Sequence, residues 1–572
     1  MKWLRRKCRN EVASGRPRAA HAPALEALES RWLLNAVWDG AGVDGDHIHI
    51  ALTGEGTMEV QQPILQTGNP DILKITLLDT EGCGTVLAIT VTKAPTGDGL
   101  ARIGRITGGA NCGIHFLNAP KVNIVGTATV NPNDPDGDGS GYGIDLQGLL
   151  RQMVVNNIEN GMDIWAKQEG VWYPDCVASN LAIGDLSAGS SITLGSRVEK
   201  FTANSWAPGG VFDSKSIDAM TIKGNFGAGI ATLRGVGPVT VGGTVGGDAA
   251  NPAIWDIPRN LGAVKMGGSN AYWSVDVGGN IASLTSTAGN LNYDTIQATS
   301  AGPMTAKKDM IGASLSLTQG VDPSNPKVAA LGAVTVGGAV GGLWTIGGHA
   351  GAIKAGSSNI NWNVAIEGDV PSLTIGGNMY FTAWSANSLG SLKVGSNMGD
   401  GLHAGTMRLW KAPGAKLALG KVTVAKWMQD VQIRSVGNIG TVTAMAMDTV
   451  NIFAGVQDAV NGLLSAVSPQ SAGSYLVGAD ASIAGITIKG IPAGPGVQPW
   501  MRHSMMDTTI IAARTGPMSL FGPLDGGGGA VAAKTIGTIK ITKPDGTKFS
   551  WPQPPGYWPA AADDLVTVVR LT

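Results

Sequence analysis

Short runs of alternating apolar and polar residues recur through the middle of the chain, and many lead directly into glycine. Three examples are Val-Thr-Val at 334–336, Leu-Thr-Ile at 373–375 and Leu-Lys-Val at 392–394. Alternation with a period of two places the outer residues on one face and the middle residue on the other, which is typical of a half-buried strand. Glycine allows the positive φ of a sharp corner. The pattern predicts many short strands separated by tight turns.

A longer internal duplication shows how these strands are organised. Residues 239–291 and 334–380 form a duplication, within which the segment from Ile254 aligns without gaps with the segment from Leu343. This alignment places Trp255 on Trp344 and Trp273 on Trp362, an offset of 362 − 273 = 89 residues. If one coil takes about 22 residues the repeat spans four coils, and if it takes about 30 it spans three. Strands that recur about every ten positions, without helical segments between them, predict a parallel β-solenoid.

One stretch also resembles a known family. The sequences Gly-Ile-Asp-Leu at 143–146 and Val-Asn-Asn-Ile at 155–158 resemble repeats of the right-handed parallel β-helix of the pectate-lyase-like class. The resemblance implies an all-β, right-handed solenoid, with Asn156 or Asn157 in an internal ladder at a turn. Tandem antiparallel β-sandwiches are the competing fold, because a repeat of about 90 residues is also close to one immunoglobulin-like domain.

The pattern divides the chain into four parts. Residues 37–100 contain further alternating runs, such as His-Ile-His-Ile at 47–50, and are expected to form a small β module that caps the solenoid. The solenoid itself is expected over 101–545. Residues 546–572 are rich in proline and aromatic residues, which predicts an extended C-terminal tail. Residues 1–36 form a basic leader.

The leader contains a short motif that points to export. Its residues resemble the LEPR-x-LL motif near the start of many surface or secreted proteins of planctomycete-type bacteria, although Ser30 replaces the motif's proline. The resemblance implies an extracellular or cell-surface location; the alternative is a short amphipathic helix. The sequence contains no run of 18 apolar residues and so does not predict a transmembrane helix. The matching residues are Leu28, Glu29, Arg31, Leu33 and Leu34.

Composition narrows the possible partners. The chain has 41 Lys and Arg residues against 42 Asp and Glu residues, a net charge of −1, which argues against a nucleic-acid partner. Glycine occupies 84 of 572 positions and charged residues only 15%, as suits tight turns and apolar walls.

One acidic segment has the spacing of a calcium loop. Its aspartates follow the pattern D-x-D-x-D-G-x₅-E, with aspartate replacing the final glutamate. Bound Ca²⁺ would staple the loop rather than take part in catalysis, and the alternative is an ordinary acidic turn. The predicted ligands are Asp134, Asp136, Asp138, Tyr142 and Asp145.

The cysteines leave two possibilities open. Outside the leader, Cys83 and Cys112 form the more plausible disulfide if the compartment is oxidising. Buried free thiols are the favoured alternative, because the spacing fits no metal site.

Catalytic motifs are sparse. The chain lacks a G-x-S-x-G nucleophile elbow, and the one local collection that suits a lyase is Asp145, Arg151, Asp163 and Lys167. The sequence therefore favours a non-catalytic exported repeat protein, structural or adhesive, that binds a polysaccharide or a surface protein along the solenoid. The alternative is a polysaccharide lyase or glycoside hydrolase of the pectate-lyase-like class. Four tryptophans provide either a sugar-stacking stripe or an internal ladder: Trp255, Trp273, Trp344 and Trp362.

Overall fold

The computed structural model shows an all-β protein whose strands pair mainly in parallel, so the predicted parallel β-solenoid is confirmed. The chain divides into two compact units, Met1–Thr240 (unit 1) and Val241–Thr572 (unit 2). No helix of the described residues has the length and apolar character that a membrane span requires. The structure describes residues 36–63, 70–80, 84–110, 112–126, 141–168, 171–174, 177–322, 324–325, 328–359, 361–411, 417–455, 480–490, 505–521, 529–542, 546–551 and 567–570.

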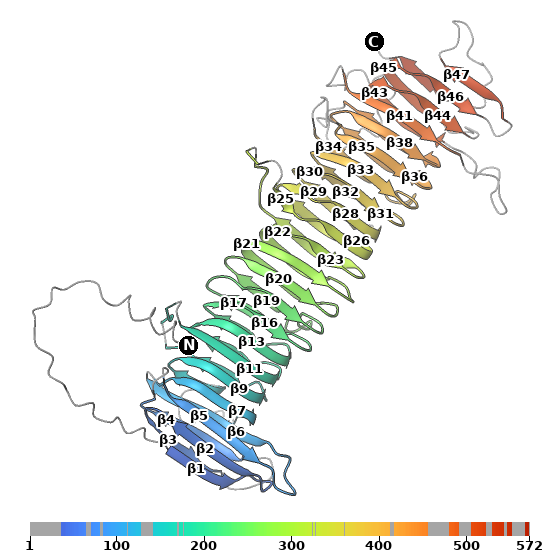
Figure 1. The fold of residues 1–572 in the computed structure, drawn as a ribbon. Helices are drawn as coiled ribbons and strands as arrows, with labels where there is room; N and C mark the ends of the chain where they lie inside the picture. The colour runs from blue at the N-terminus through green and yellow to red at the C-terminus, as the bar shows by residue number, and fades with distance from the viewer. Residues whose placement is uncertain are drawn as a thin grey trace, which may run out of the picture. The chain divides into compact units, whose positions relative to one another are not determined.

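Unit 1 begins with an antiparallel module that leads into the solenoid (Figure 1). Strand β2 pairs antiparallel with β1 and β5, and β3 pairs antiparallel with β4. Beyond them, β6 joins β4 and β7 joins β5 in parallel. The module therefore protects one end of the parallel stack, where open backbone groups would otherwise form an edge. The strands of unit 1 are β1 (Ala36–Ala41), β2 (His47–Thr53), β3 (Thr57–Gln61), β4 (Ile72–Leu78), β5 (Val86–Thr92), β6 (Ala101–Ala110), β7 (Ile114–Ile124), β8 (Tyr142–Gln147), β9 (Leu150–Ile158), β10 (Asp163–Ala166), β11 (Ala178–Leu186), β12 (Ile192–Leu194), β13 (Arg197–Trp206), β14 (Val211–Ser214), β15 (Ser216–Ile217), β16 (Met220–Ile222) and β17 (Gly229–Thr232), while β18 (Val239–Val241) spans the division between the units.

Inward-facing residues of unit 1 stack in columns, one residue per coil. Large aromatic side chains fill the later coils, where the Phe201 and Phe212 rings lie 4.9 Å apart and the Trp206 and Phe226 rings 5.7 Å apart. All four are buried. One column runs in register through Ile106, Ile144, Ile164, Ile192, Phe212 and Ile230.

Asparagines of β7 and β9 are hydrogen-bonded to each other, but Asn156 and Asn157 lie half-buried within β9 rather than in an internal ladder at a turn. The Asn156 side chain donates a 2.7 Å hydrogen bond to Oδ1 of Asn123, two strands away in sequence but adjacent in the stack. Asn123 in turn donates to Glu159 over 2.7 Å, and Asn157 accepts the backbone N–H of Asp185 at 2.9 Å. These side chains satisfy polar groups between adjacent coils.

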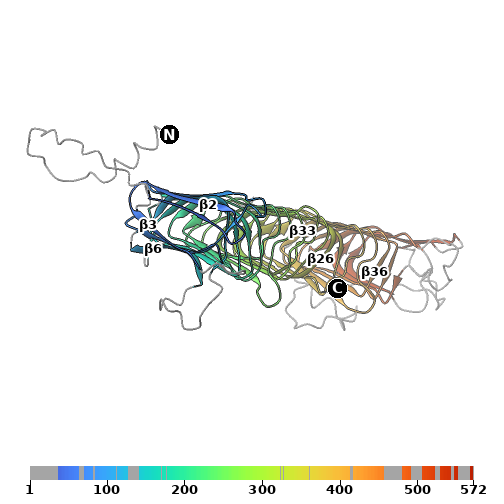
Figure 2. The ribbon, with the colours of Figure 1, turned by 90° about the horizontal axis from the view of Figure 1, so that it is seen from below.

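Unit 2 repeats the same plan, and the coils within each unit are also visible from below in Figure 2. Among its described strands, the one antiparallel pairing joins β46 and β47, whereas tandem sandwiches would pair their strands antiparallel throughout. The strands that follow β18 are β19 (Ala253–Ile257), β20 (Leu261–Met266), β21 (Trp273–Ser286), β22 (Tyr293–Ala301), β23 (Met304–Ala306), β24 (Met310–Leu317), β25 (Ala329–Leu331), β26 (Val334–Ile346), β27 (His349–Ala350), β28 (Ile353–Ser358), β29 (Asn363–Ile366), β30 (Asp369–Val370), β31 (Leu373–Ile375), β32 (Ala383–Ala386), β33 (Ser388–Val394), β34 (Gly405–Leu409), β35 (Leu419–Val424), β36 (Trp427–Gln429), β37 (Val431–Ser435), β38 (Ile439–Ala444), β39 (Ala446–Asp448), β40 (Asn451–Ala454), β41 (Ser482–Ile488), β42 (Met505–Met506), β43 (Thr509–Thr515), β44 (Met518–Phe521), β45 (Ala530–Ile536), β46 (Ile539–Thr542), β47 (Lys548–Trp551) and β48 (Thr567–Arg570).

The register of unit 2 resolves the length of the duplicated segment. Trp255 pairs with Val275, Val275 with Ile296, Ile296 with Leu315, and Leu315 with Trp344. These four steps cover 344 − 255 = 89 residues, so the duplication spans four coils. Each member of the column is buried, as an inward position of a solenoid requires.

A second inward column of unit 2 consists of methionines. Met379, Met398, Met428, Met447 and Met505 pair in register, the first three through single β-bridges. All five side chains are buried. Unbranched thioether side chains can fill an irregular corner without a fixed shape, which explains their use where the strands are shortest.

Glycines let the corners of adjacent coils approach closely. A Cβ on Gly395 would lie 1.9 Å from the carbonyl oxygen of Gly376, closer than any side chain can come. Gly376 itself occupies the same corner one coil earlier, because Thr374 pairs with Lys393 two positions before each glycine. Backbone proximity therefore requires glycine at corners such as Gly395 and Gly337, whereas a Cβ on Gly376 would meet no atom closer than 3.4 Å.

Candidate functional site

The predicted export and calcium residues are only partly described. Leu28, Glu29, Arg31, Leu33 and Leu34 lie outside the described residues. The same holds for three of the five predicted calcium ligands, which are Asp134, Asp136 and Asp138.

The two described calcium-ligand candidates lie on strand β8. Asp145 accepts from Nη2 of Arg105 at 3.2 Å and from Nε2 of Gln147 at 3.4 Å. Its side chain is only 16% exposed and that of Arg105 only 12%. The Tyr142 ring packs against Trp165 with centroids 5.6 Å apart. The Asp145 carboxylate is therefore engaged by a guanidinium on the solenoid wall.

Members of the lyase-like set have different partners in the structure. Asp163 accepts the backbone N–H of Ser191 at 2.6 Å, and burial raises the pKa of this carboxyl. Lys167 lies over the Trp172 ring, 3.7 Å from its centroid. Arg151 instead lies on β9 near His115, where burial and the Arg151 charge together lower the pKa of the histidine.

A further carboxyl, that of Asp213, belongs to the same outward ladder as Asp145. Burial raises the pKa of Asp213, and the Lys167 charge opposes that rise. The ladder runs from Asp145 through Trp165 and Thr193 to Asp213, three coils further on. Three coil steps place the two carboxyls about 14 Å apart. Glycosidases need a separation of about 5–9.5 Å, so this pair does not form such a site.

The four tryptophans are internal, and the sugar-stacking interpretation of them is wrong. Trp255, Trp273, Trp344 and Trp362 are each 0% exposed. The Trp255 and Trp273 rings are 5.0 Å apart at 79°, and the Trp344 and Trp362 rings 5.7 Å apart at 80°. The duplication thus preserves an edge-to-face pair in the core. Alternation gave a signal for this, because Ala253, Trp255 and Ile257 share the buried face of β19.

Cys112 is a buried free thiol whose Sγ lies 3.6 Å from the carbonyl oxygen of Leu77. Cys83 lies outside the described residues. The favoured interpretation of a buried thiol holds for Cys112.

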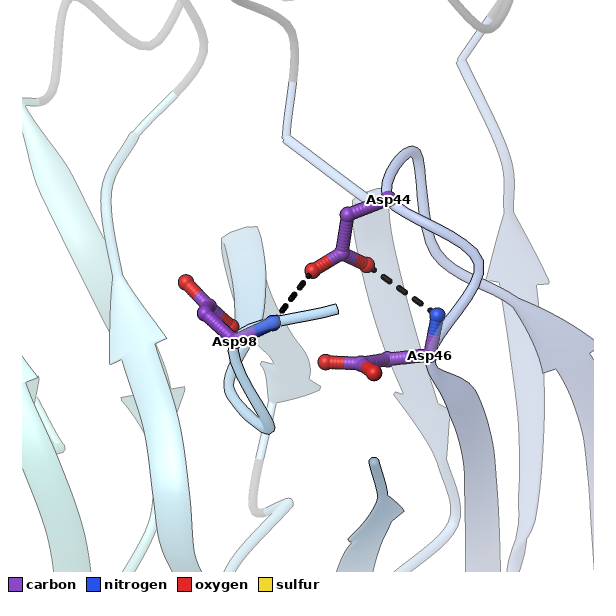
Figure 3. A group of neighbouring side chains, drawn as sticks. All are labelled: Asp44, Asp46 and Asp98. Carbon is purple, nitrogen blue, oxygen red and sulfur yellow. Dashed lines mark hydrogen bonds between the residues drawn. The ribbon is translucent and has the colours of Figure 1, made fainter. Parts of the chain in front are cut away.

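Sequence reasoning missed an acidic cluster in the N-terminal module (Figure 3). Oxygen atoms of Asp44, Asp46 and Asp98 lie within 4.8 Å of one another. The turn before β2 supplies the first two, and the loop after β5 supplies the third. A signal existed in the Asp-Gly-Asp turn at 44–46, but nothing local showed that residue 98 folds back onto it.

Backbone N–H groups hold the carboxylates of this cluster. Buried Asp46 accepts from Ala94 and Gly99, both at 2.6 Å. Asp44 accepts from the N–H groups of Asp46 and Asp98, both at 3.1 Å. Although burial opposes the shift, these hydrogen bonds lower the pKa of Asp44. The cluster joins two loops, and its oxygen donor set also suits a hard cation such as Ca²⁺.

A long regular feature of the described surface is an outward ladder on unit 2. Its members occupy the middle position of the apolar–polar–apolar triplets, and every one is exposed or half-buried. Successive members pair in register across twelve coils. In order they are Lys265, Thr285, Thr305, Thr335, Lys354, Thr374, Lys393, Thr423, Thr443, Thr487, Ser519 and Lys540.

Small side chains flank this ladder. The positions two residues before and two residues after each member are mostly Gly, Ala, Ser, Thr or Pro. We call the ladder together with these two flanking columns the Thr/Lys face. It contains no Asp or Glu among its described residues. Hydroxyl and ammonium groups are therefore the polar side chains that it offers to a partner.

Comparison with known proteins finds no family model that matches the chain, and no significant match among curated proteins or solved structures.

Proposed function

We propose that this chain is a non-catalytic exported repeat protein that acts structurally or adhesively at the cell surface and binds a polysaccharide or a surface protein along its coils. The observation that carries the proposal is the twelve-coil Thr/Lys face of unit 2. A partner with a repeating structure can contact successive coils in the same way. Many weak contacts then add up to a useful affinity.

The chemistry of the outward positions supports binding rather than turnover. The hydroxyl and ammonium groups of the Thr/Lys face lack a carboxylate partner for acid–base catalysis. In unit 1, Asp145 is engaged by Arg105, and Asp213 lies about 14 Å from it. Export is inferred from the basic leader and its LEPR-x-LL-like residues, such as Leu33 and Leu34.

The test measures binding and product release together. The full chain is incubated with acidic and neutral polysaccharides, with calcium and with chelator. The proposal expects binding without new reducing ends or unsaturated products. Product release that chelator abolishes would instead support the carbohydrate-active enzyme. Antibody labelling of intact cells tests the surface location, and purely internal signal would contradict it.

We further propose a structural Ca²⁺ in the segment that contains Asp134, Asp136 and Asp138. It is supported by the spacing of these residues. A D134N/D136N double variant should lose a calcium-dependent rise in Tm. The matched D44N variant should retain this calcium-dependent rise in Tm. If D44N alone lost the rise, the ion would instead lie at the acidic cluster of Asp44, Asp46 and Asp98.

A further inference from the structure

We infer that the Thr/Lys face of unit 2 binds an extended anionic polysaccharide, carboxylated or sulfated, along the stacking direction of the coils and without a bridging metal ion. This inference rests on the proposed function and specifies its ligand. It follows from the distribution of charge on the face, from the shape of the face, and from the side chains that it lacks.

Charge is strongly segregated on this face. It carries seven lysines and no acidic residue among the described positions. None of the seven forms an ion pair with another described residue of the chain. Acidic residues of unit 2 lie elsewhere, as with Asp256 and Asp276, which pair on a different outward ladder. The lysines are Lys265, Lys307, Lys354, Lys393, Lys421, Lys489 and Lys540.

A face with this charge attracts anions although the whole chain is almost neutral. The net charge of the protein is −1, so overall attraction of polyanions is absent. The local excess of positive charge acts within about 8 Å at physiological ionic strength. A ligand must therefore follow the face closely, and its anionic groups must recur along its length.

The geometry suits a ligand that runs from coil to coil. Adjacent coils are spaced by about 4.8 Å, so Lys354 and Lys393, two coils apart, present ammonium groups about 10 Å from each other along the stack. Thr374 lies between them in the same ladder. Its hydroxyl both donates and accepts hydrogen bonds, as sugar hydroxyls do.

The flanking columns leave this ladder accessible. Glycines follow Thr335, Thr374 and Lys393 at the corner, and small residues precede them. Gly376 and Gly395 are exposed or nearly so and place no side chain beside the ladder. A pyranose chain can therefore approach the hydroxyls and ammonium groups directly.

The absent side chains favour a glycan over other polyanions and over a protein. The described Thr/Lys face has no arginine, and Phe521 is its one aromatic residue. Recognition of nucleic-acid bases relies on arginine and on stacked aromatic side chains, and protein interfaces depend on Trp, Tyr and Arg anchors. Lysine and threonine alone suit a ligand recognised by charge and hydroxyl contacts.

The test uses three polymers with one backbone. Carboxymethyl cellulose, cellulose sulfate and hydroxyethyl cellulose carry carboxylate, sulfate or neutral groups, and binding of the full chain to each is measured by biolayer interferometry. We expect both anionic polymers to bind, with affinity that falls as salt rises and does not change with chelator. The ratio between the two shows which anion is preferred.

Variants locate the binding on the face. K354Q/K393Q should bind both anionic polymers about 5- to 20-fold more weakly. The matched control R259Q/K534Q removes two exposed positive charges outside the face and should bind like the wild type. Equal Tm values for the two variants ensure that a loss of binding is not a loss of folding.

The outcomes separate this inference from the proposed function. Equal binding of the neutral and anionic polymers would overturn the inference and leave the polymer-binding function in place. Equal weakening by the control pair would also overturn it, because the face would then not be the site. Tighter binding to duplex DNA than to either anionic polymer would assign the face to nucleic acid. Binding to none of the three polymers would overturn the inference, and the polysaccharide panel described above would then decide the proposed function separately.

Discussion

The two units share one interior design and differ in what they present to solvent. Unit 1 has an outward ladder of Thr76, Thr107, Asp145, Trp165, Thr193 and Asp213. That ladder mixes charge, aromatic rings and hydroxyls, whereas the central ladder of the Thr/Lys face contains only Thr, Ser and Lys. Inward columns in both units are mainly apolar, with a few small polar residues among them, such as Ser214 in unit 1 and Ser286 in unit 2.

This difference separates the demands of folding from those of function. An inward residue must fill the coil, so its size and polarity are constrained. An outward residue on a parallel ladder is constrained only by cross-strand compatibility. Because strand formation allows mixed outward residues in unit 1, folding alone does not require the uniformity of the central ladder of the Thr/Lys face, and the proposed ligand would account for it.

The largest effect is expected from the interior of unit 2. Trp344→Ala should lower the free energy of unfolding by about 4 kcal/mol, because it removes a fully buried indole and leaves a cavity. Thr345→Ala, on the exposed side of the same strand, should change it by less than about 0.5 kcal/mol. Urea denaturation followed by circular dichroism measures both. Similar losses in the two variants would contradict the inward and outward assignment.

A slightly smaller effect is expected in the N-terminal module of unit 1. Asp46→Ala leaves the N–H groups of Ala94 and Gly99 without their acceptor and should destabilise the protein by about 3 kcal/mol. Asp98→Ala should cost less than about 1 kcal/mol, because its carboxylate is exposed and accepts from nearby Leu100. Thermal unfolding compares the two. If Asp98→Ala lost more stability than Asp46→Ala, the main role of the acidic cluster would not be to join the two loops.

The outward ladders can be contrasted directly by adding one negative charge to each. Thr374→Glu places a carboxylate on the Thr/Lys face between two lysines and should weaken binding of cellulose sulfate roughly 2- to 5-fold. Thr193→Glu makes the same change on the unit 1 ladder and should leave binding unaltered. Biolayer interferometry at low salt is the measurement. Equal weakening would mean that net charge, rather than the face, controls binding.

The smallest effect concerns a corner of unit 2. Burial and the carboxylates of Asp448 and Asp400 raise the pKa of Asp430, so the folded state holds this proton more tightly than the unfolded state. The contribution of Asp430 to the stability of the folded state is therefore most favourable below the ordinary aspartate pKa. It is lost as the pH rises through the raised pKa of the folded state. Asp430→Asn should unfold at a slightly higher temperature than wild type at pH 7, with the difference shrinking toward pH 4.

Asparagine also tolerates the positive φ of 50° at residue 430, so this variant adds no backbone strain. Tm measured across this pH range in wild type and variant gives the comparison. A Tm difference that grows toward low pH would contradict the sign.

Several features were predictable because they are encoded locally. Triplets such as the one centred on Thr374 alternate with a period of two, which identifies a strand and its buried face. The 89-residue offset marked equivalent tryptophans before any coil length was known. Alternation also placed Trp255 with Ala253 and Ile257, although the exposed Ile254 beside it obscured this signal.

Other features depend on segments that are far apart in the chain. Asp98 reaches Asp44 only because β5 returns beside β2. Arg105 meets Asp145 across 40 residues, so a carboxylate that the sequence suggested as a calcium ligand is engaged by a guanidinium. No local pattern contains either pairing.

The sequence by itself determined the strands, their inward and outward faces and the solenoid, because period-two alternation and glycine corners act over a few residues. Only the tertiary structure decided which outward residues become neighbours. Lys354 and Thr374 are 374 − 354 = 20 residues apart, and Thr443 and Thr487 are 487 − 443 = 44 apart, yet both pairs are adjacent in one ladder. Coil length varies while the register between coils is fixed by backbone hydrogen bonds, so a continuous face exists only in the folded chain.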